Sequence, residues 1–139
     1  MNYYAVLDTN VLVSALLARH LDSSPVLILQ QMLAGIITPV YDDGILAEYG
    51  EVLHRPKFNF SESHISTLLS AILQFGVSVE RLQTDATLLD PKDLVFYEVV
   101  MAKREDNAYL VTGNIKHFPK EPFIVTPNEM LDILSRDGD

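Results

Sequence analysis

The sequence contains no cysteine, which excludes disulfide bonds and thiolate metal sites. It also lacks any apolar run that approaches the ~20 residues of a membrane span. Its first residues carry no basic segment, and Asp8 interrupts their apolar stretch, so we expect no signal peptide. Repeats, low-complexity tracts and linkers are absent as well. Together these absences predict a cytoplasmic protein with no membrane partner.

What is present fits one globular domain. The chain has 139 residues, of which 48% are hydrophobic, enough to bury a core without cross-links. Its net charge of −9 argues against broad, charge-driven binding of nucleic acid. The same acidity is compatible with several carboxylates gathered around a cation, and charge alone does not separate these interpretations. We predict a single domain over residues 1–139.

Strand-like and helix-like segments alternate along this chain. Short apolar segments typical of buried strands lie at 3–8, 36–40, 77–79, 107–112 and 122–125. Apolar residues at helical spacing occupy 11–17, 24–35, 43–53, 61–75, 93–100 and the stretch from 127 onwards. Alternation of this kind predicts an α/β fold, in which helices cover both faces of a mostly parallel sheet of about five strands.

Several helix starts carry capping signals. Ser24 precedes a proline and is predicted to cap the second helix, and Asp42 or Asp43 to cap the third. Thr126 and Glu129 have the spacing of a capping box at the start of the last helix.

Four polar residues lie where a parallel sheet would bring them to one edge. Asp8 and Asn114 directly follow two of the strands. Asp93 starts a helix, and Glu48 lies about one and a half turns into another. Ligands of open α/β sheets bind at the carboxyl ends of the strands. Carboxylate and amide oxygens suit Mg²⁺ or Mn²⁺, which would relieve the repulsion between the acids and activate water towards a phosphodiester.

Each of these residues also has an ordinary structural explanation. Asp8 and Asp93 are typical helix N-caps, and Glu48 is typical of a solvated helix face. Asn114 after Gly113 is a common turn pair. Only the four together, in this order, favour a metal site.

Two other enzyme classes begin with a strand that leads into an aspartate. A phosphatase of the haloacid-dehalogenase type needs a second Asp two residues later, where this chain has Asn10. A two-component receiver domain needs an acidic pair near the first strand, but Asp42 and Asp43 follow the second. The sequence therefore disfavours both classes.

Four motifs match one known family. They are residues 6–12 (VLDTNVL), 45–53 (ILAEYGEVL) with 55–58 (RPKF), 90–93 (DPKD) and 109–114 (YLVTGN). With these motifs the chain resembles the PIN-domain nucleases, and most of all their branch of toxin components from prokaryotic toxin–antitoxin pairs. The resemblance covers nearly the whole chain. It implies a three-layer α/β/α sandwich and a Mg²⁺- or Mn²⁺-dependent endoribonuclease that leaves a 5′-phosphate.

The resemblance also implies roles for single residues. The metal ligands would be Asp8, Glu48 and Asp93, and the supporting residues would be Thr9, Asn10 and Thr112. Asn10 would orient Asp8, and the two threonines would support a network of hydroxyls. Asn114 would complete the catalytic set.

Asn114 is also where this chain departs from the family pattern, because members with a full acidic set have an aspartate there. An amide can bind a metal through its oxygen, but it brings no charge. Asp90 lies near enough in sequence to Asp93 to compensate in part. The alternative to an enzyme is a degenerate PIN domain that binds RNA or a protein partner without cleavage.

RNA is the substrate that the resemblance implies, and a few basic residues flank the predicted site. Arg55 and Lys57 follow the helix of Glu48, and Lys116 follows Asn114. We predict that these three contact phosphates, although ordinary solvated surface explains them equally well. The family further implies a small antitoxin partner and a homodimer.

Overall fold

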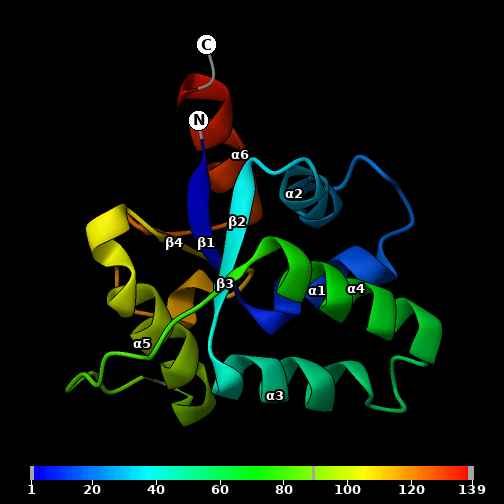
Figure 1. Cartoon of the computed structure of the whole chain (residues 1–139), viewed down its shortest axis with the longest axis horizontal. Coiled ribbons are helices and arrows are strands. Elements are labelled where there is room, and N and C mark those ends of the chain that lie inside the picture. The colour runs from blue at the N-terminus through cyan, green and yellow to red at the C-terminus, as the bar shows by residue number, and fades with distance from the viewer. Residues whose placement is uncertain (1, 89, 138–139) are drawn as a thin grey trace.

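The computed structural model of the chain describes residues 2–88 and 90–137. Within them, five strands form one sheet, and six α-helices pack around it (Figure 1). The strands are β1 (Tyr3–Leu7), β2 (Ile37–Tyr41), β3 (Val77–Ser78), β4 (Tyr109–Val111) and β5 (Ile124–Val125). The helices are α1 (Thr9–Leu17), α2 (Ser24–Leu33), α3 (Asp43–Leu53), α4 (Glu62–Phe75), α5 (Leu94–Ala102) and α6 (Pro127–Asp137). Single 3-10 turns lie at Pro91–Asp93, Arg104–Asp106 and Ile115–His117.

The sheet has the order β3-β2-β1-β4-β5, and all four strand pairs are parallel. β1 is the middle strand and is covered on both faces. Its residues Ala5, Val6 and Leu7 are therefore all fully buried. The register pairs Leu7 with Val111. The residues that follow this pair therefore emerge side by side at the carboxyl edge of the sheet.

The helices form two layers around this sheet. α1, α2, α4 and α6 pack together on one face, and α5 packs against β1, β2 and β4 on the other (Figure 1). α3 lies near the carboxyl ends of the strands and contacts both α1 and α5. The architecture confirms the predicted α/β sandwich. No helix within the described residues has the length and apolar character needed to cross a membrane.

Most of the predicted helix ends are confirmed. Asp42 caps α3 by accepting a hydrogen bond from the backbone N–H of Ile45 at 2.8 Å. Thr126 and Glu129 form the reciprocal capping box of α6, with distances of 2.9 and 3.2 Å. The prediction for α2 was wrong by one residue, because Ser23 is its N-cap and Ser24 is already helical. The loop expected before Asp93 includes Leu89, which lies outside the described residues.

Candidate functional site

Asp8 lies at the carboxyl end of β1, the central strand, and is only 6% exposed. Its backbone N–H donates to the carbonyl of Val111 at 2.9 Å, which continues the pairing of β1 with β4 by one residue. Asp8 occupies the N-cap position of α1, yet its side chain makes no capping hydrogen bond. Capping therefore does not explain a carboxylate buried at this point.

Thr112 at the end of β4 and Asn10 in the first turn of α1 hold one oxygen of Asp8. The Thr112 hydroxyl donates to Asp8 Oδ2 at 2.8 Å, and Asn10 Nδ2 donates to the same oxygen at 3.4 Å. Both donors are held in turn by backbone N–H groups. Asn114 donates to Thr112 Oγ1, and Gly113 donates to Asn10 Oδ1, each at 3.0 Å. This network confirms neither a metal nor a reaction, but it fixes the carboxylate before any ligand arrives.

The proton affinity of Asp8 is unusually high for an aspartate. Its pKa is raised from 3.8 to about 6, chiefly by burial and to a smaller extent by the charge of Asp93. The Thr112 hydroxyl and the nearby backbone N–H groups of Asn10 and Thr9 act in the opposite direction. Asp8 is thus a carboxylate whose negative charge is only partly compensated by the surrounding protein.

Asp93 is the second carboxylate of this edge. It sits at the start of α5 without making a capping bond. Instead, its Oδ2 lies 3.3 Å from His117 Nδ1, and its side chain is 16% exposed. Burial and the charge of Asp90 raise the pKa of Asp93, whereas the contact with His117 lowers it. Asp8 and Asp93 therefore repel each other across the edge, with a histidine as the nearest compensating group.

Glu48 lies on α3, next to the residue that anchors this helix at the end of β1. The neighbouring Tyr49 is 1% exposed, and its hydroxyl donates to the carbonyl of Leu7 at 2.5 Å, which fixes α3 against the end of β1. Burial and the charge of Asp8 raise the pKa of Tyr49, so it stays a proton donor. Glu48 is half-buried and makes no hydrogen bond or ion pair with another described residue, although its charge raises the pKa of Arg55.

The donor set of this edge fits a divalent cation of the Mg²⁺ type. No three His, Asp or Glu side chains among the described residues are grouped closely enough to form a ready-made metal cage. Mg²⁺ does not need such a cage, since it is usually held by one or two carboxylates together with water and substrate phosphates. Asp8 is a buried carboxylate whose pKa is raised in part by the charge of Asp93, and a cation stabilises such a pair of acids.

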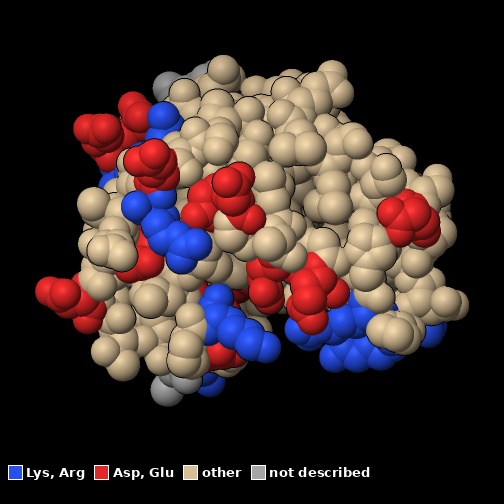
Figure 2. All heavy atoms as spheres, turned by 60° about the horizontal axis from the view of Figure 1, so that its bottom comes forward, with Lys and Arg blue, Asp and Glu red and all other residues tan. Residues whose placement is uncertain are grey.

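The other predicted site residues differ in their surroundings. The hydroxyl of Thr9 is buried and has no hydrogen-bond partner among the described residues. Arg55 is held by Glu51 at 2.8 Å, a spacing of four residues that the sequence already contained. Lys57 and Lys116 are exposed and form no ion pair within the described residues. Figure 2, which looks towards the carboxyl edge, shows acidic side chains around a notch, with basic side chains on either side.

Two further residues contribute to this edge without a motif that marks them. His117 lies in the 3-10 turn after β4, and Tyr49 belongs to the buried face of α3. Their contacts with Asp93 and Leu7 join segments 24 and 42 residues apart. Helical spacing indicated that Tyr49 is buried, but no periodic signal marks a histidine in a single 3-10 turn.

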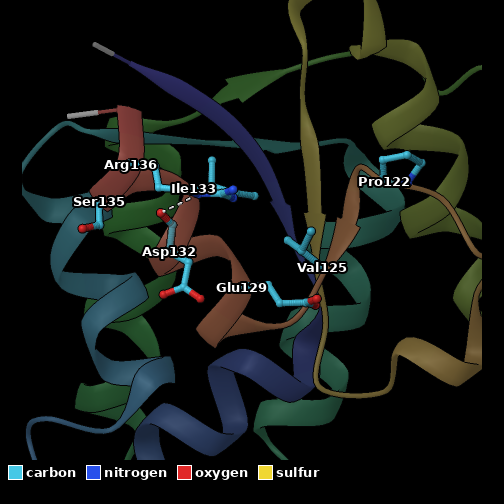
Figure 3. A pocket seen from close by; sticks show the side chains of 7 residues that line it. All are labelled: Pro122, Val125, Glu129, Asp132, Ile133, Ser135 and Arg136. Atoms are coloured by element: carbon cyan, nitrogen blue, oxygen red, sulfur yellow. Dashed lines mark hydrogen bonds between the residues drawn. The ribbon is translucent and has the colours of Figure 1, made fainter. Parts of the chain in front are cut away.

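A hollow of about 580 Å³ lies elsewhere, between β5 and α6 (Figure 3). Its lining includes Glu129, which caps α6, and Asp132, whose backbone carbonyl accepts a hydrogen bond from Arg136 at 3.4 Å. None of the predicted site residues lines this hollow.

A parallel α/β sandwich with carboxylates at its carboxyl edge is the architecture expected of a nuclease-type domain. Comparison with known families then identifies the family. A family model described as a PIN domain matches residues 4–116 of the 139, so the chain belongs to the PIN-domain family. The match spans Asp8, Glu48, Asp93 and Asn114. No curated protein and no solved structure gave a significant match.

Proposed function

We propose that this PIN domain is a metal-dependent endoribonuclease in which Asp8, Glu48 and Asp93 hold Mg²⁺ or Mn²⁺. The observation that carries the proposal is the state of Asp8. It is buried, fixed by Thr112 and Asn10, and its pKa is raised to about 6 with another carboxylate as neighbour. A structural aspartate would have a cation partner or a capping hydrogen bond, whereas Asp8 stands at the start of α1 with neither an ion pair nor a side-chain capping bond among the described residues.

The residues of the chain would divide the work as follows. When bound, the cation would neutralise phosphate charge and make water more acidic. Asp8 would be held in one orientation by its two donors, so that binding requires little rearrangement. His117, in the 3-10 turn that follows β4, would keep Asp93 in place. Lys57 and Lys116 would contact phosphates on either side, and Arg55 would contribute less because Glu51 already neutralises it.

The alternative is a degenerate PIN domain that binds RNA or protein without cleavage. It depends on Asn114, the position at which members of the family with a full acidic set carry an aspartate. Its backbone N–H still supports Thr112, so this supporting contact does not depend on the missing charge.

A cleavage assay separates the two. We expect a labelled single-stranded RNA to be cut with Mn²⁺ or Mg²⁺, to be spared with EDTA, and to yield 5′-phosphate ends. RNA binding without cleavage at saturating Mn²⁺ would favour the degenerate domain. In that case Asn114→Asp should restore cleavage, while Asn2→Asp, which adds the same charge at an exposed position near the start of β1, should not.

We further propose, on the basis of the family resemblance, that the protein is a cytoplasmic toxin component with a small antitoxin and a homodimeric state. An apolar groove of about 260 Å³ between α1, α2 and α4 supports a protein partner. It is lined by Leu16, Leu29, Met32, Leu33 and Leu68 among others, and Leu33 is 54% exposed. Light scattering of the purified chain, alone and with a co-expressed neighbouring gene product, tests both partners.

A further inference from the structure

The turn between α3 and α4 carries two stacked aromatic rings and a lysine. The ring centroids of Phe58 and Phe60 are 5.3 Å apart, and their planes differ by only 10°. Lys57 Nζ lies 5.1 Å from the centroid of Phe58. Phe60 packs against the hydrophobic core, but Phe58 is partly exposed and is not among the described residues that do so. Phe58 therefore stacks on Phe60, which packs against the core, and does not itself pack into the core.

The backbone fixes the position of the Phe58 ring. The N–H of Phe58 donates to the carbonyl of Arg55, and the N–H of Asn59 to that of Pro56, each at 3.1 Å. Asn59 has a φ of 54°, a left-handed conformation that asparagine tolerates better than most residues. This conformation accompanies a tight change of chain direction between the two stacked phenylalanines. A ligand would meet a surface that is already formed.

Among the described residues, Lys57 is the cation of this turn that no acid neutralises. Arg55 is neutralised by Glu51 at 2.8 Å, and His54 lies 2.6 Å from Glu62 across the turn. Lys57 is exposed and has no ion-pair partner among the described residues. A partly exposed ring beside an unpaired ammonium group offers stacking to a base and charge to a phosphate.

Magnitudes favour a nucleobase over the present contact with lysine. A cation over an exposed aromatic ring is worth only about 2- to 5-fold in an equilibrium constant. Stacking of one base on an aromatic side chain is worth about 5- to 100-fold in affinity. A base would thus displace the ammonium group from the ring, and the lysine would then be free to meet a neighbouring phosphate.

The turn that carries Phe58 lies close to the predicted site. Glu48 lies on the same helix, and the axis from it to the end of α3 is about 8 Å long. A single strand that passes Asp8 and follows α3 would reach Phe58 within a few nucleotides. We propose that Phe58, backed by Phe60, is a stacking platform for a base of single-stranded RNA, and that Lys57 binds the adjoining phosphate. This inference rests on the proposed ribonuclease function.

A single-tryptophan variant tests the platform directly, because the chain contains no tryptophan. We expect the emission of Phe58→Trp to fall saturably when a short oligouridylate is added, in an Asp8→Asn background that blocks cleavage. An abasic oligoribonucleotide of equal length should not quench it. Phe123→Trp is the matched control. The ring of Phe123 also has a cation over it, with Arg104 Cζ 4.2 Å from the ring centroid, but Phe123 lies just before β5, at the amino ends of the strands. Its emission should stay constant.

Affinity measurements give a second, independent readout that needs no tryptophan. Fluorescence anisotropy of labelled oligouridylate should show about 5- to 100-fold weaker binding to Phe58→Leu, which keeps apolar volume but not the ring. Phe58→Tyr should bind like the wild type. Lys57→Gln should lower the slope of log affinity against log salt by about one.

The inference is overturned if Phe58→Leu binds the RNA as tightly as the wild type, or if saturating RNA leaves the emission of Phe58→Trp unchanged. Metal-dependent cleavage by the wild type alongside either result would keep the ribonuclease proposal and remove only the platform. If RNA does not quench Phe58→Trp, Phe58→Leu binds as tightly as the wild type and the wild type does not cleave RNA, both the platform and the ribonuclease proposal are removed. Should Phe58→Trp fail to fold, the contrast between leucine and tyrosine decides alone.

Discussion

Asp8 and Asp42 occupy equivalent places on neighbouring parallel strands but have different surroundings. Each follows the last residue of its strand, holds the N-cap position of the next helix, and is 6–7% exposed. Asp42 caps Ile45 at 2.8 Å and pairs with Arg81 at 3.1 Å. Asp8 has no capping bond and faces Asp93 instead of a cation.

The difference shows how one local pattern serves two purposes. The charge of Asp42 is satisfied inside the protein, so it stabilises the start of α3. The charge of Asp8 is left partly uncompensated, which costs stability and leaves the carboxylate available to a ligand. Burial alone does not distinguish a structural from a functional aspartate. The partners of its oxygens do.

Substitution of each aspartate by asparagine should produce the largest difference between them, in the rate of RNA cleavage. Asp8→Asn keeps the shape of the side chain but removes the charge, so we expect metal-dependent RNA cleavage to fall about 1000-fold or more. Asp42→Asn should keep the wild-type rate per folded molecule. Initial rates at saturating Mn²⁺, with circular dichroism as a check of folding, measure this. A fully active Asp8→Asn protein would refute the site assignment.

The stability of the protein should also depend on pH through Asp8. The pKa of Asp8 is about 6 in the folded protein and 3.8 in the unfolded chain, so the folded state binds the proton more tightly. Its contribution is complete below about pH 4 and is lost as pH rises through about 6, a change of about 3 kcal/mol in metal-free protein. Asp93, whose pKa is also raised, adds to the same trend.

Urea unfolding in EDTA from pH 4 to pH 8 measures this loss by comparison of wild type with Asp8→Asn. The variant should lack the pH-dependent loss of stability that Asp8 causes, and it should be more stable than the wild type at pH 7. Parallel curves for the two proteins would contradict the raised pKa. Added Mn²⁺ should restore stability to the wild type at neutral pH, because binding to the folded state alone shifts the equilibrium.

Removal of Asp42 should have a smaller effect than either of the changes expected at Asp8. Asp42→Ala loses a helix cap and a partly exposed ion pair, so we expect the free energy of unfolding to fall by about 1–2 kcal/mol. Asp43→Ala, next to it but exposed, should cost less than about 1 kcal/mol. Thermal unfolding at pH 7 ranks the two. Equal losses would mean that the cap of Asp42 contributes nothing special.

Apolar patterning was sufficient to predict the sheet and the place of Asp8. The near-continuous run of Ala5, Val6 and Leu7 marks a strand buried on both faces, and strand ends in a parallel sheet meet at one edge. The contact of Asp8 with Thr112 follows from register, so it was predictable once two strand ends were recognised. The pairing of Arg55 with Glu51 was also visible as a four-residue spacing but was overlooked.

Contacts that depend on how a loop crosses the fold were not predictable. His117 meets Asp93 because a 3-10 turn after β4 comes to the start of α5, and no periodicity encodes that approach. The stacking of Phe58 on Phe60 depends on one left-handed residue between them. In both cases the chemistry lies in irregular backbone, where pattern-based reasoning has least to use.

The hydrogen bond between Thr112 and Asp8 also has a consequence for synthesis of the chain. It joins residues 104 positions apart. At typical elongation rates of about 5–20 residues per second, roughly 5–20 s pass between the addition of one partner and the other. A chain interrupted in that interval carries Asp8 but not the strand end that orients it. Unfinished products would therefore lack the assembled site and, if the proposed function holds, would not cleave the RNA around them.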